Sequence, residues 1–257
     1  MTERLAGIKR KSLIHASLAA LIFLSASHLY SQKNTLGEKR IEQTNKDYVI
    51  QGVYPQYEIP KDALMGVRGM LMDFNAPIEQ IVNSRADEFR KEVKEIRPPS
   101  ETRKSTMDLT YTTVLANNGT YSAKFETFTD VDFAAHPNAF YDCYNFNFDS
   151  WAPFTLKDIF LSSADYLKVI SDYCYKDLLK TFKDDYYKGM EDDIKKGTAP
   201  LEENFKTFNV DEKNLIITFQ YYQVGPRIWG APEVKIPYDK IKNILNPEGP
   251  LAGYYKK

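Results

Sequence analysis

An Asn-Gly pair near the middle of the chain, Asn118-Gly119, separates two runs that are rich in β-branched and aromatic residues. The runs cover residues 109–115 and residues 120–125. Asn-Gly between two such runs is a strong hairpin signal, because both central residues of the turn take positive φ. The sequence therefore predicts a pair of antiparallel strands at the centre of the fold.

Apolar residues between positions 78 and 96 recur every three or four residues, which predicts an amphipathic helix packed by one stripe. Asn75 is a favourable N-cap and Pro77 suits a first turn, so the helix is predicted to begin there. Pro98-Pro99 ends it. Residues 63–74 carry a weaker helix signal, because two glycines interrupt them.

Helical spacing also predicts an amphipathic helix over residues 166–182, capped by Ser162 or Ser163. A short helix is predicted to end in a basic turn followed by a left-handed Gly197. The other predicted elements are strands at 48–55, 215–222 and 234–236 and a closing helix at 238–245. Hairpin strands set apart from helices indicate an α+β fold, with antiparallel sheets and amphipathic helices packed on one side.

Residues 140–149 alternate between aromatic and mostly amide side chains, which is typical of a strand with one buried and one solvated face. The predicted buried face carries aromatic rings: Phe140, Tyr144, Phe146 and Phe148. The predicted wet face carries Asn145, Asn147 and Asp149. Asp142 interrupts the apolar face, so we expect that end of the strand to reach solvent.

The first 31 residues have the pattern of a secretory signal peptide: a basic segment, an apolar segment, then small and polar residues. The apolar part is about 12 residues long, whereas a spanning helix needs about 20, so cleavage is favoured over an uncleaved anchor. We expect a periplasmic or secreted protein with no membrane span after cleavage. The predicted division is a signal peptide (1–31), a flexible lead-in (32–45), an N-terminal α+β subdomain (46–155), a C-terminal subdomain (156–246) and a tail (247–257).

Lysine and arginine number 34 and aspartate and glutamate number 35, so the formal net charge is −1. Proteins that bind the phosphate backbone of nucleic acids usually carry an excess of positive charge, which this chain lacks. No nucleic-acid partner is therefore expected. His136 is the one histidine after the predicted signal peptide, which excludes a His-rich zinc site. The sequence has no G-x-S-x-G motif and no glycine-rich phosphate loop. We therefore expect no metal, cofactor or catalytic residue, although an Asp/Glu pair for glycosidic cleavage stays open.

Cys143 and Cys174 are the two cysteines of the chain. In an oxidising compartment a disulfide between them would close a loop of about 31 residues and contribute about 3–4 kcal/mol. Two ordinary buried thiols are the alternative, and it is the one we favour.

Residues 125–156 contain ten aromatic residues, five acidic residues and no lysine or arginine. Most of these rings are expected to form sheet core, while any that reach the surface suit a sugar ring or a basic protein. His136 lies in a turn at 135–138, where we expect it to bond its own loop rather than to catalyse. A second acidic stretch, at 184–203, is either a solvated helix face or part of the same surface.

A series of motifs then resembles a known family. The motifs are Tyr54-Pro55-Gln56, Ala135-His136-Pro137-Asn138, Asn145-Phe146-Asn147-Phe148-Asp149, Leu156-Lys157-Asp158-Ile159-Phe160, Phe205-Lys206-Thr207-Phe208, and Phe219-Gln220-Tyr221-Tyr222-Gln223-Val224-Gly225-Pro226 with Glu233-Val234-Lys235-Ile236-Pro237-Tyr238. Their order and spacing, over about residues 46–246, resemble the extracytoplasmic domains of the lysozyme-sensing anti-sigma factor RsiV. They are also similar to accessory domains of the peptidoglycan deacetylase PdaC.

This resemblance implies a non-catalytic, RsiV-ectodomain-like α+β module at the cell envelope. In the sensor the module binds lysozyme, and in the deacetylase it accompanies a separate catalytic domain. An anti-sigma role is not expected, because 11 residues precede the apolar segment. Arg227, Ile228 and Trp229 stand where the family has small and aromatic residues.

The leading hypothesis is a secreted or periplasmic binding module that recognises lysozyme or another cell-wall-related ligand. The candidate contact residues lie in or beside loops: His136, Asn138, Asp142, Arg227 and Trp229. The alternatives are an envelope enzyme that acts on glycan through Asp or Glu residues, and a structural envelope protein.

Overall fold

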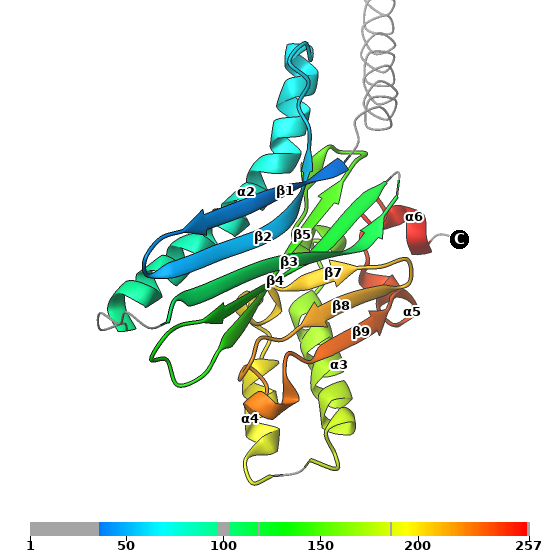
Figure 1. Ribbon diagram of the computed structural model, residues 1–257. Helices are drawn as coiled ribbons and strands as arrows, with labels where there is room; N and C mark the ends of the chain where they lie inside the picture. The colour runs from blue at the N-terminus through cyan, green and yellow to red at the C-terminus, as the bar shows by residue number, and fades with distance from the viewer. Residues whose placement is uncertain (1–35, 97–102, 118, 186, 256–257) are drawn as a thin grey trace, which may run out of the picture.

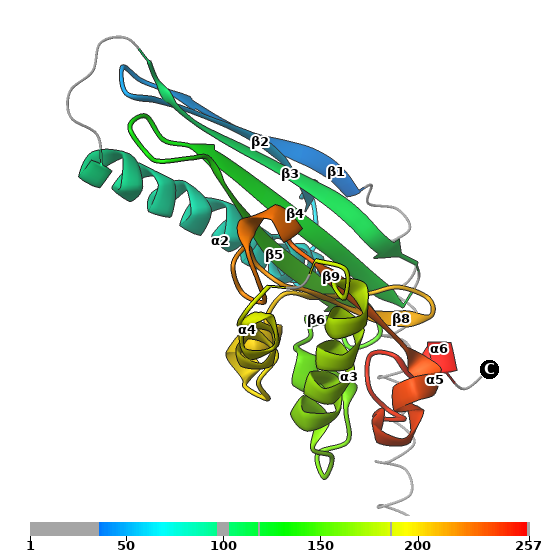
Figure 2. The same ribbon diagram turned by 90° about the horizontal axis from the view of Figure 1, so that it is seen from below.

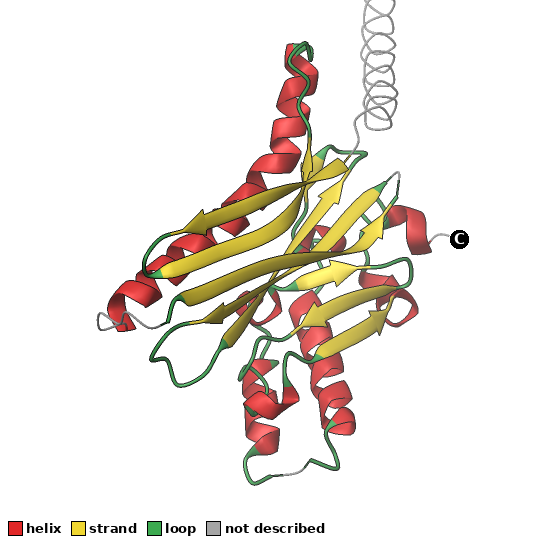
Figure 3. Cartoon of the chain, viewed as in Figure 1, coloured by secondary structure: helices red, strands yellow, loops and turns green. Residues whose placement is uncertain are grey.

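The computed structural model describes residues 36–96, 103–117, 119–185 and 187–255, so the predicted signal peptide lies outside it. Within these residues the strands form a six-stranded sheet in the order β1-β2-β3-β4-β5-β6 and a three-stranded sheet in the order β7-β8-β9 (Figures 1 and 3). The strands are β1 (Leu36–Thr44), β2 (Tyr48–Tyr57), β3 (Ser105–Ala116), β4 (Thr120–Asp130), β5 (Asn138–Asn147), β6 (Ala152–Pro153), β7 (Phe208–Val210), β8 (Asn214–Thr218) and β9 (Glu233–Pro237).

The longer helices are α2 (Met65–Ile96), α3 (Tyr166–Thr181) and α4 (Met190–Gly197). The short ones are η1 (Leu156–Ile159), η2 (Glu202–Phe205), η3 (Arg227–Trp229), α5 (Tyr238–Ile241), η4 (Lys242–Ile244) and α6 (Ala252–Tyr255). Figure 2 shows α2 along one side of the large sheet and α3 and α4 beneath the small one. None of the helices in the described ranges is both long enough and apolar enough to cross a lipid bilayer.

The predicted central hairpin is confirmed: β3 and β4 pair in antiparallel fashion over their length. Asn117 closes the turn, because its Oδ1 accepts from the backbone N–H groups of Gly119 (3.0 Å) and Thr120 (2.9 Å). The predicted α+β class is confirmed as well. One neighbour pair, β2 with β3, is parallel, because the chain crosses over through α2 between these strands.

The flexible lead-in predicted at 32–45 is wrong from residue 36 onward, where β1 pairs with β2 in antiparallel fashion. Most β1 side chains are exposed and many are charged, as in an edge strand that must not pair with other chains. The segment is polar because β1 is an edge strand. A polar composition is equally typical of a loop, which is why the sequence predicted one.

The helix start predicted at Asn75 is also wrong, because α2 runs continuously through Pro77. Asn75 is buried and bonds the end of β2 instead of capping a helix. Its Oδ1 accepts from the Tyr57 N–H (2.9 Å) and its Nδ2 donates to the Tyr57 carbonyl (2.8 Å). Asn75 therefore ties the middle of α2 to the sheet.

Two hydrophobic cores lie within the described residues. One fills the space between α2 and the large sheet and centres on Phe74, whose ring contacts five other aromatic rings. The other lies among α3, α4 and the small sheet. Leu115 and Cys143 pack in the second core; otherwise the residues up to Trp151 belong to the first core and those from Phe154 onward to the second.

The wet face predicted for β5 is wrong for Asn145 and Asn147, which are buried. The physical reason is that β7 packs on the face of β4 and β5 that points away from α2. Asn145 donates to the Phe208 carbonyl of β7 (3.0 Å) and accepts from the Ser122 hydroxyl of β4 (2.7 Å). These hydrogen bonds offset the cost of burying the Asn145 amide.

The same contact is completed from the small sheet. Asn209 donates to the Ala123 carbonyl and to Ser122 Oγ, both at 2.9 Å. The Val210 N–H also donates to Ser122 Oγ (3.1 Å). We call Ser122, Asn145 and Asn209 the polar seam, because together they fix the position of one sheet against the other.

Three local predictions in the C-terminal half need correction. Asp165 rather than Ser162 or Ser163 caps α3, through a bond from the Lys168 N–H. Gly197 ends α4 without a left-handed conformation, and a Cβ there would lie 2.0 Å from the Gln223 carbonyl oxygen. The strand predicted at 215–222 ends at Thr218, and residues 221–223 form a turn.

We expect Asn209→Ala to lower the free energy of unfolding by about 1–3 kcal/mol, because it leaves the buried Ser122 hydroxyl and Ala123 carbonyl short of a donor. Urea unfolding followed by circular dichroism measures the change. Gln43→Ala is the control, since it removes one exposed bond from Arg90, and a change within about 0.5 kcal/mol is expected. Equal stability of the two variants would contradict the role of the seam.

Candidate functional site

Three of the five candidate contact residues come together in the structure. The Arg227 guanidinium donates to the Pro137 carbonyl and to Asn138 Oδ1 (3.3 Å), and its Nη1 lies 3.2 Å from His136 Nδ1. The guanidinium also lies over the Tyr221 ring, 5.2 Å from its centroid. Arg227 thus joins the loop before β5 to the loop before β9, and we call this group the His136–Arg227 cluster.

Exposed side chains lie in the same two loops as this cluster. Tyr222 is 57% exposed, and its hydroxyl lies 3.4 Å from His136 Nε2. Phe133 is 61% exposed in the loop of His136, and Ile228, next to Arg227, is 90% exposed. Phe133 and Tyr222 also take positive φ, at 67° and 63°. Such backbone conformations are costly for bulky residues and concentrate at functional sites.

The fourth candidate, Asp142, pairs with a residue of α2. Arg85 donates to both carboxylate oxygens of Asp142, at 2.6 and 2.8 Å, and also to Glu88 (2.7 Å). Burial works to lower the pKa of Arg85, but the bonds and charges of Asp142 and Glu88 outweigh it and raise that pKa. Asp142 is partly buried and neutralised, so it offers little free negative charge to a partner.

The fifth candidate, Trp229, lies away from the cluster. Its ring stacks on Phe182 with centroids 3.7 Å apart, and it also packs closely on Gly225. Trp229 therefore packs the loop before β9 against Phe182, the residue that follows α3. Its neighbour Ile228 projects into solvent instead.

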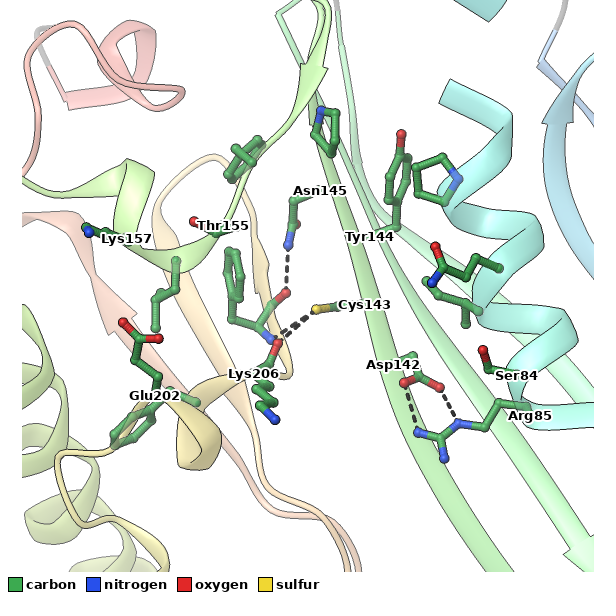
Figure 4. Close-up of a pocket in the computed structure, with 18 of the residues that line it drawn as sticks. Ser84, Arg85, Asp142, Cys143, Tyr144, Asn145, Thr155, Lys157, Glu202 and Lys206 are labelled. Atoms are coloured by element: carbon green, nitrogen blue, oxygen red, sulfur yellow. Dashed lines mark hydrogen bonds and ion pairs between the residues drawn. The ribbon is translucent and has the colours of Figure 1, made fainter. Parts of the chain in front are cut away.

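Two clefts adjoin along the open edge of β5. The smaller, of about 460 Å³, runs from Asn138 past Tyr141 to Tyr221 and Tyr222. The larger, of about 650 Å³, lies between α2 on one side and α3 and η2 on the other (Figure 4). Arg85, Asp142 and Lys206 line both clefts, so the two are contiguous. We call the larger one the β5-edge cleft.

Most rings of residues 125–156 are core, as expected from the sequence. The exposed ones are Phe128 (41%) and Phe133 (61%), while Phe140 and Tyr141 are half-buried and line the smaller cleft. Tyr141 donates to Glu126, and burial, followed by the charge of Glu126, raises its pKa. The seven acidic residues of 184–203 are all exposed. Among the described residues no three His, Cys, Asp or Glu side chains are placed to hold a metal ion.

Sequence reasoning missed Arg85, Lys206 and Gln220 as lining residues. Arg85 is one of several charged residues on α2, and no local pattern separates it from the others. Gln220 belongs to a motif that carried the family resemblance, but its amide faces Tyr141 of β5, which is 79 positions away in the sequence. Only tertiary contacts single these side chains out.

The disulfide considered between Cys143 and Cys174 does not occur in the structure, where both cysteines are free. The Cys143 thiol donates to the Lys206 carbonyl and accepts from the Phe208 N–H, both at 3.3 Å. Cys174 is fully buried on α3. Burial raises the pKa of the Cys143 thiol to about 12 and also raises the pKa of Cys174.

Residues 157–239 match the model of a family described as a protein of unknown function, DUF3298. The chain is also 27% identical over 176 residues to the peptidoglycan-N-acetylmuramic acid deacetylase PdaC of Bacillus subtilis (strain 168). That match covers 68% of this chain and 36% of PdaC, so the chain spans about a third of its relative. Residues 157–239 are therefore similar to the DUF3298 family, and the chain is similar to part of PdaC.

Two solved structures share the fold. A DUF3298-family member from Bacteroides fragilis aligns with a TM-score of 0.60 and 16% identity, covering 87% of this chain and 99% of that one. A DUF3298-family protein from Pseudomonas aeruginosa aligns with a TM-score of 0.59 and 13% identity, covering 83% and 95%. At these identities the likeness concerns the fold alone.

We expect the native protein to react very slowly with a disulfide reagent such as DTNB at pH 8. A pKa of about 12 for Cys143, in place of 9.0, makes its reactive thiolate about 1,000-fold scarcer at that pH. In denaturant without reductant, two thiols should titrate per chain. Fast reaction of the native protein, or no thiol in the denatured one, would contradict this description.

Proposed function

We propose that this chain is a non-catalytic binding module of the bacterial cell envelope, periplasmic or secreted, whose His136–Arg227 cluster forms the centre of a face that binds lysozyme. The observation that carries the proposal is the cluster itself. Arg227 clamps two loops together, and these loops present Phe133, Tyr222 and Ile228 to solvent. Exposed aromatic and apolar anchors around an arginine are typical of protein-binding hot spots.

The relation to PdaC supports the location, since that relative is named as a deacetylase of peptidoglycan N-acetylmuramic acid. The exposed acidic residues of 184–203 support a cationic partner. Glu203, at the end of this stretch, lines the same cleft as Tyr221 and Tyr222, so the negative charge extends to the proposed face. Lysozyme is strongly cationic, and opposite charges speed encounter and favour one orientation.

We expect titration calorimetry with lysozyme to detect binding at low salt, and the affinity to fall as sodium chloride screens the exposed charges. Tyr222→Ala and Ile228→Ala should each weaken binding about tenfold, because each removes an exposed anchor. Leu64→Ala is the matched control: Leu64 is 72% exposed, next to the start of α2, and its loss should leave the affinity unchanged.

Absence of binding at high micromolar lysozyme and low salt would overturn the proposed partner. Equal loss of affinity in Leu64→Ala would overturn the proposed face. The non-catalytic role has its own test, which is mass spectrometry of peptidoglycan fragments after incubation with the protein. Unchanged fragments are expected, and a product that disappears when a carboxylate is replaced would favour a glycan-acting enzyme.

A further inference from the structure

The outer edge of β5 is open over a short stretch. On one side β5 pairs with β4 along its whole length, whereas on the other side β6 pairs only with Phe146 and Asn147. In an antiparallel strand, alternate residues point their N–H and C=O groups to the same edge. Tyr141, Cys143 and Asn145 therefore point these groups outward, away from β4.

Side chains and loops of the protein satisfy both ends of this edge. At Tyr141, the Gln220 amide makes the two hydrogen bonds that a neighbouring strand would make. Its Oε1 accepts from the Tyr141 N–H (3.0 Å), and its Nε2 donates to the Tyr141 C=O (2.7 Å). The Asn145 carbonyl accepts from the Phe154 N–H (3.0 Å). Between them, the outward N–H and C=O of Cys143 have no partner among the described residues.

This unpaired peptide group lies in the wall of the β5-edge cleft. Cys143, Tyr144 and Asn145 line the cleft, and Figure 4 shows β5 between α2 and the segment around Lys206. Half-buried apolar side chains form the other walls: Pro77 and Ile81 from α2 and Tyr166 and Leu167 from α3. An unpaired donor and acceptor beside apolar walls suits an extended peptide, which adds as a strand and places alternate side chains in pockets.

The charges of the cleft select among peptides. Arg85 pairs with both Asp142 and Glu88, which leaves one negative charge on this group. Glu202 also lines the cleft, and its carboxylate accepts from the Tyr166 hydroxyl (3.4 Å). Lys157 and Lys206 line the same cleft, and neither has an ion-pair partner among the described residues. Because Gln220 and Phe154 block the edge on both sides of Cys143, a bound strand cannot extend far beyond one paired residue. A short peptide with a free terminal carboxylate fits both features.

We propose that the β5-edge cleft is a second binding site, which takes a short extended peptide ending in a free carboxylate. One peptide residue pairs with Cys143 through two backbone hydrogen bonds. Its two neighbours point their side chains to the α2 face, near Ile81, because opposite residues of a strand pair share a face. Lys157 and Lys206 attract the carboxylate. This site is distinct from the His136–Arg227 cluster and does not depend on lysozyme binding.

The probe is the tripeptide acetyl-Leu-Ala-Leu as the free acid, titrated into ¹⁵N-labelled protein and followed by NMR. We expect the Cys143 amide signal to shift and its hydrogen exchange to slow. N-methylation of the alanine should weaken binding at least tenfold, since it removes the N–H that would donate to the Cys143 carbonyl. N-methylation of the last leucine should have little effect, because that N–H points away from β5.

Two variants of α2 separate binding from folding. Ser84 is exposed and lines the cleft, so Ser84→Trp should fill it and abolish the shift at Cys143. Asn83 is exposed and does not line the cleft, so Asn83→Trp should bind as the wild type does. Both variants should keep their response to lysozyme.

The carboxylate is tested with the C-terminal amide of the same peptide, which should bind at least threefold more weakly than the acid. In the double variant Lys157→Ala/Lys206→Ala this difference should vanish. The proposal is overturned if the Cys143 signal does not move at millimolar peptide, or if Ser84→Trp and Asn83→Trp bind equally. It is also overturned if the trimer of N-acetylglucosamine shifts Cys143 and the peptide does not.

Discussion

Hydrogen bonding across the polar seam determines how the two sheets of this protein meet. Ser122, Asn145 and Asn209 are all buried, and each bonds across the contact between β4, β5 and β7. Buried amides need specific partners, so this contact permits few alternative registers, unlike apolar packing. The seam holds the C-terminal half beside the edge of β5, and both clefts exist because of that placement.

The two proposed binding surfaces lie at the start of β5 and at its open edge, where side chains and loops bond to the strand in place of a neighbouring strand. Near residue 141 the Gln220 amide occupies the edge of β5, and farther on the Phe154 N–H does. At the start of β5, Arg227 clamps the loop that carries His136. The clamp leaves apolar side chains exposed on an ordered loop, which lowers the entropy that a partner must remove on binding. At Cys143 the groups that face a partner are the backbone N–H and C=O rather than side chains.

Much of the fold could be predicted from local patterns, and the failures share one cause. The β3–β4 hairpin, the second half of α2 and α3 follow from turn chemistry and periodicity. The prediction failed where a distant element changes the meaning of a residue. Asn75 looks like a cap and instead bonds Tyr57, and Asn145 looks solvated and instead bonds Phe208. The edge strand β1 looks like a loop because its partner β2 is needed to recognise it.

The sequence by itself determined the α+β class, the central hairpin and the loops that carry His136 and Arg227, because these depend on neighbouring residues. The tertiary structure alone decided that these two residues, 91 positions apart, lie 3.2 Å from each other while Trp229 does not join them. It also decided that Asp142 is neutralised by Arg85 and that the edge of β5 stays open at Cys143. The physical reason is that a side chain's surroundings are set by packing between distant segments, which leaves no periodic signal in the chain.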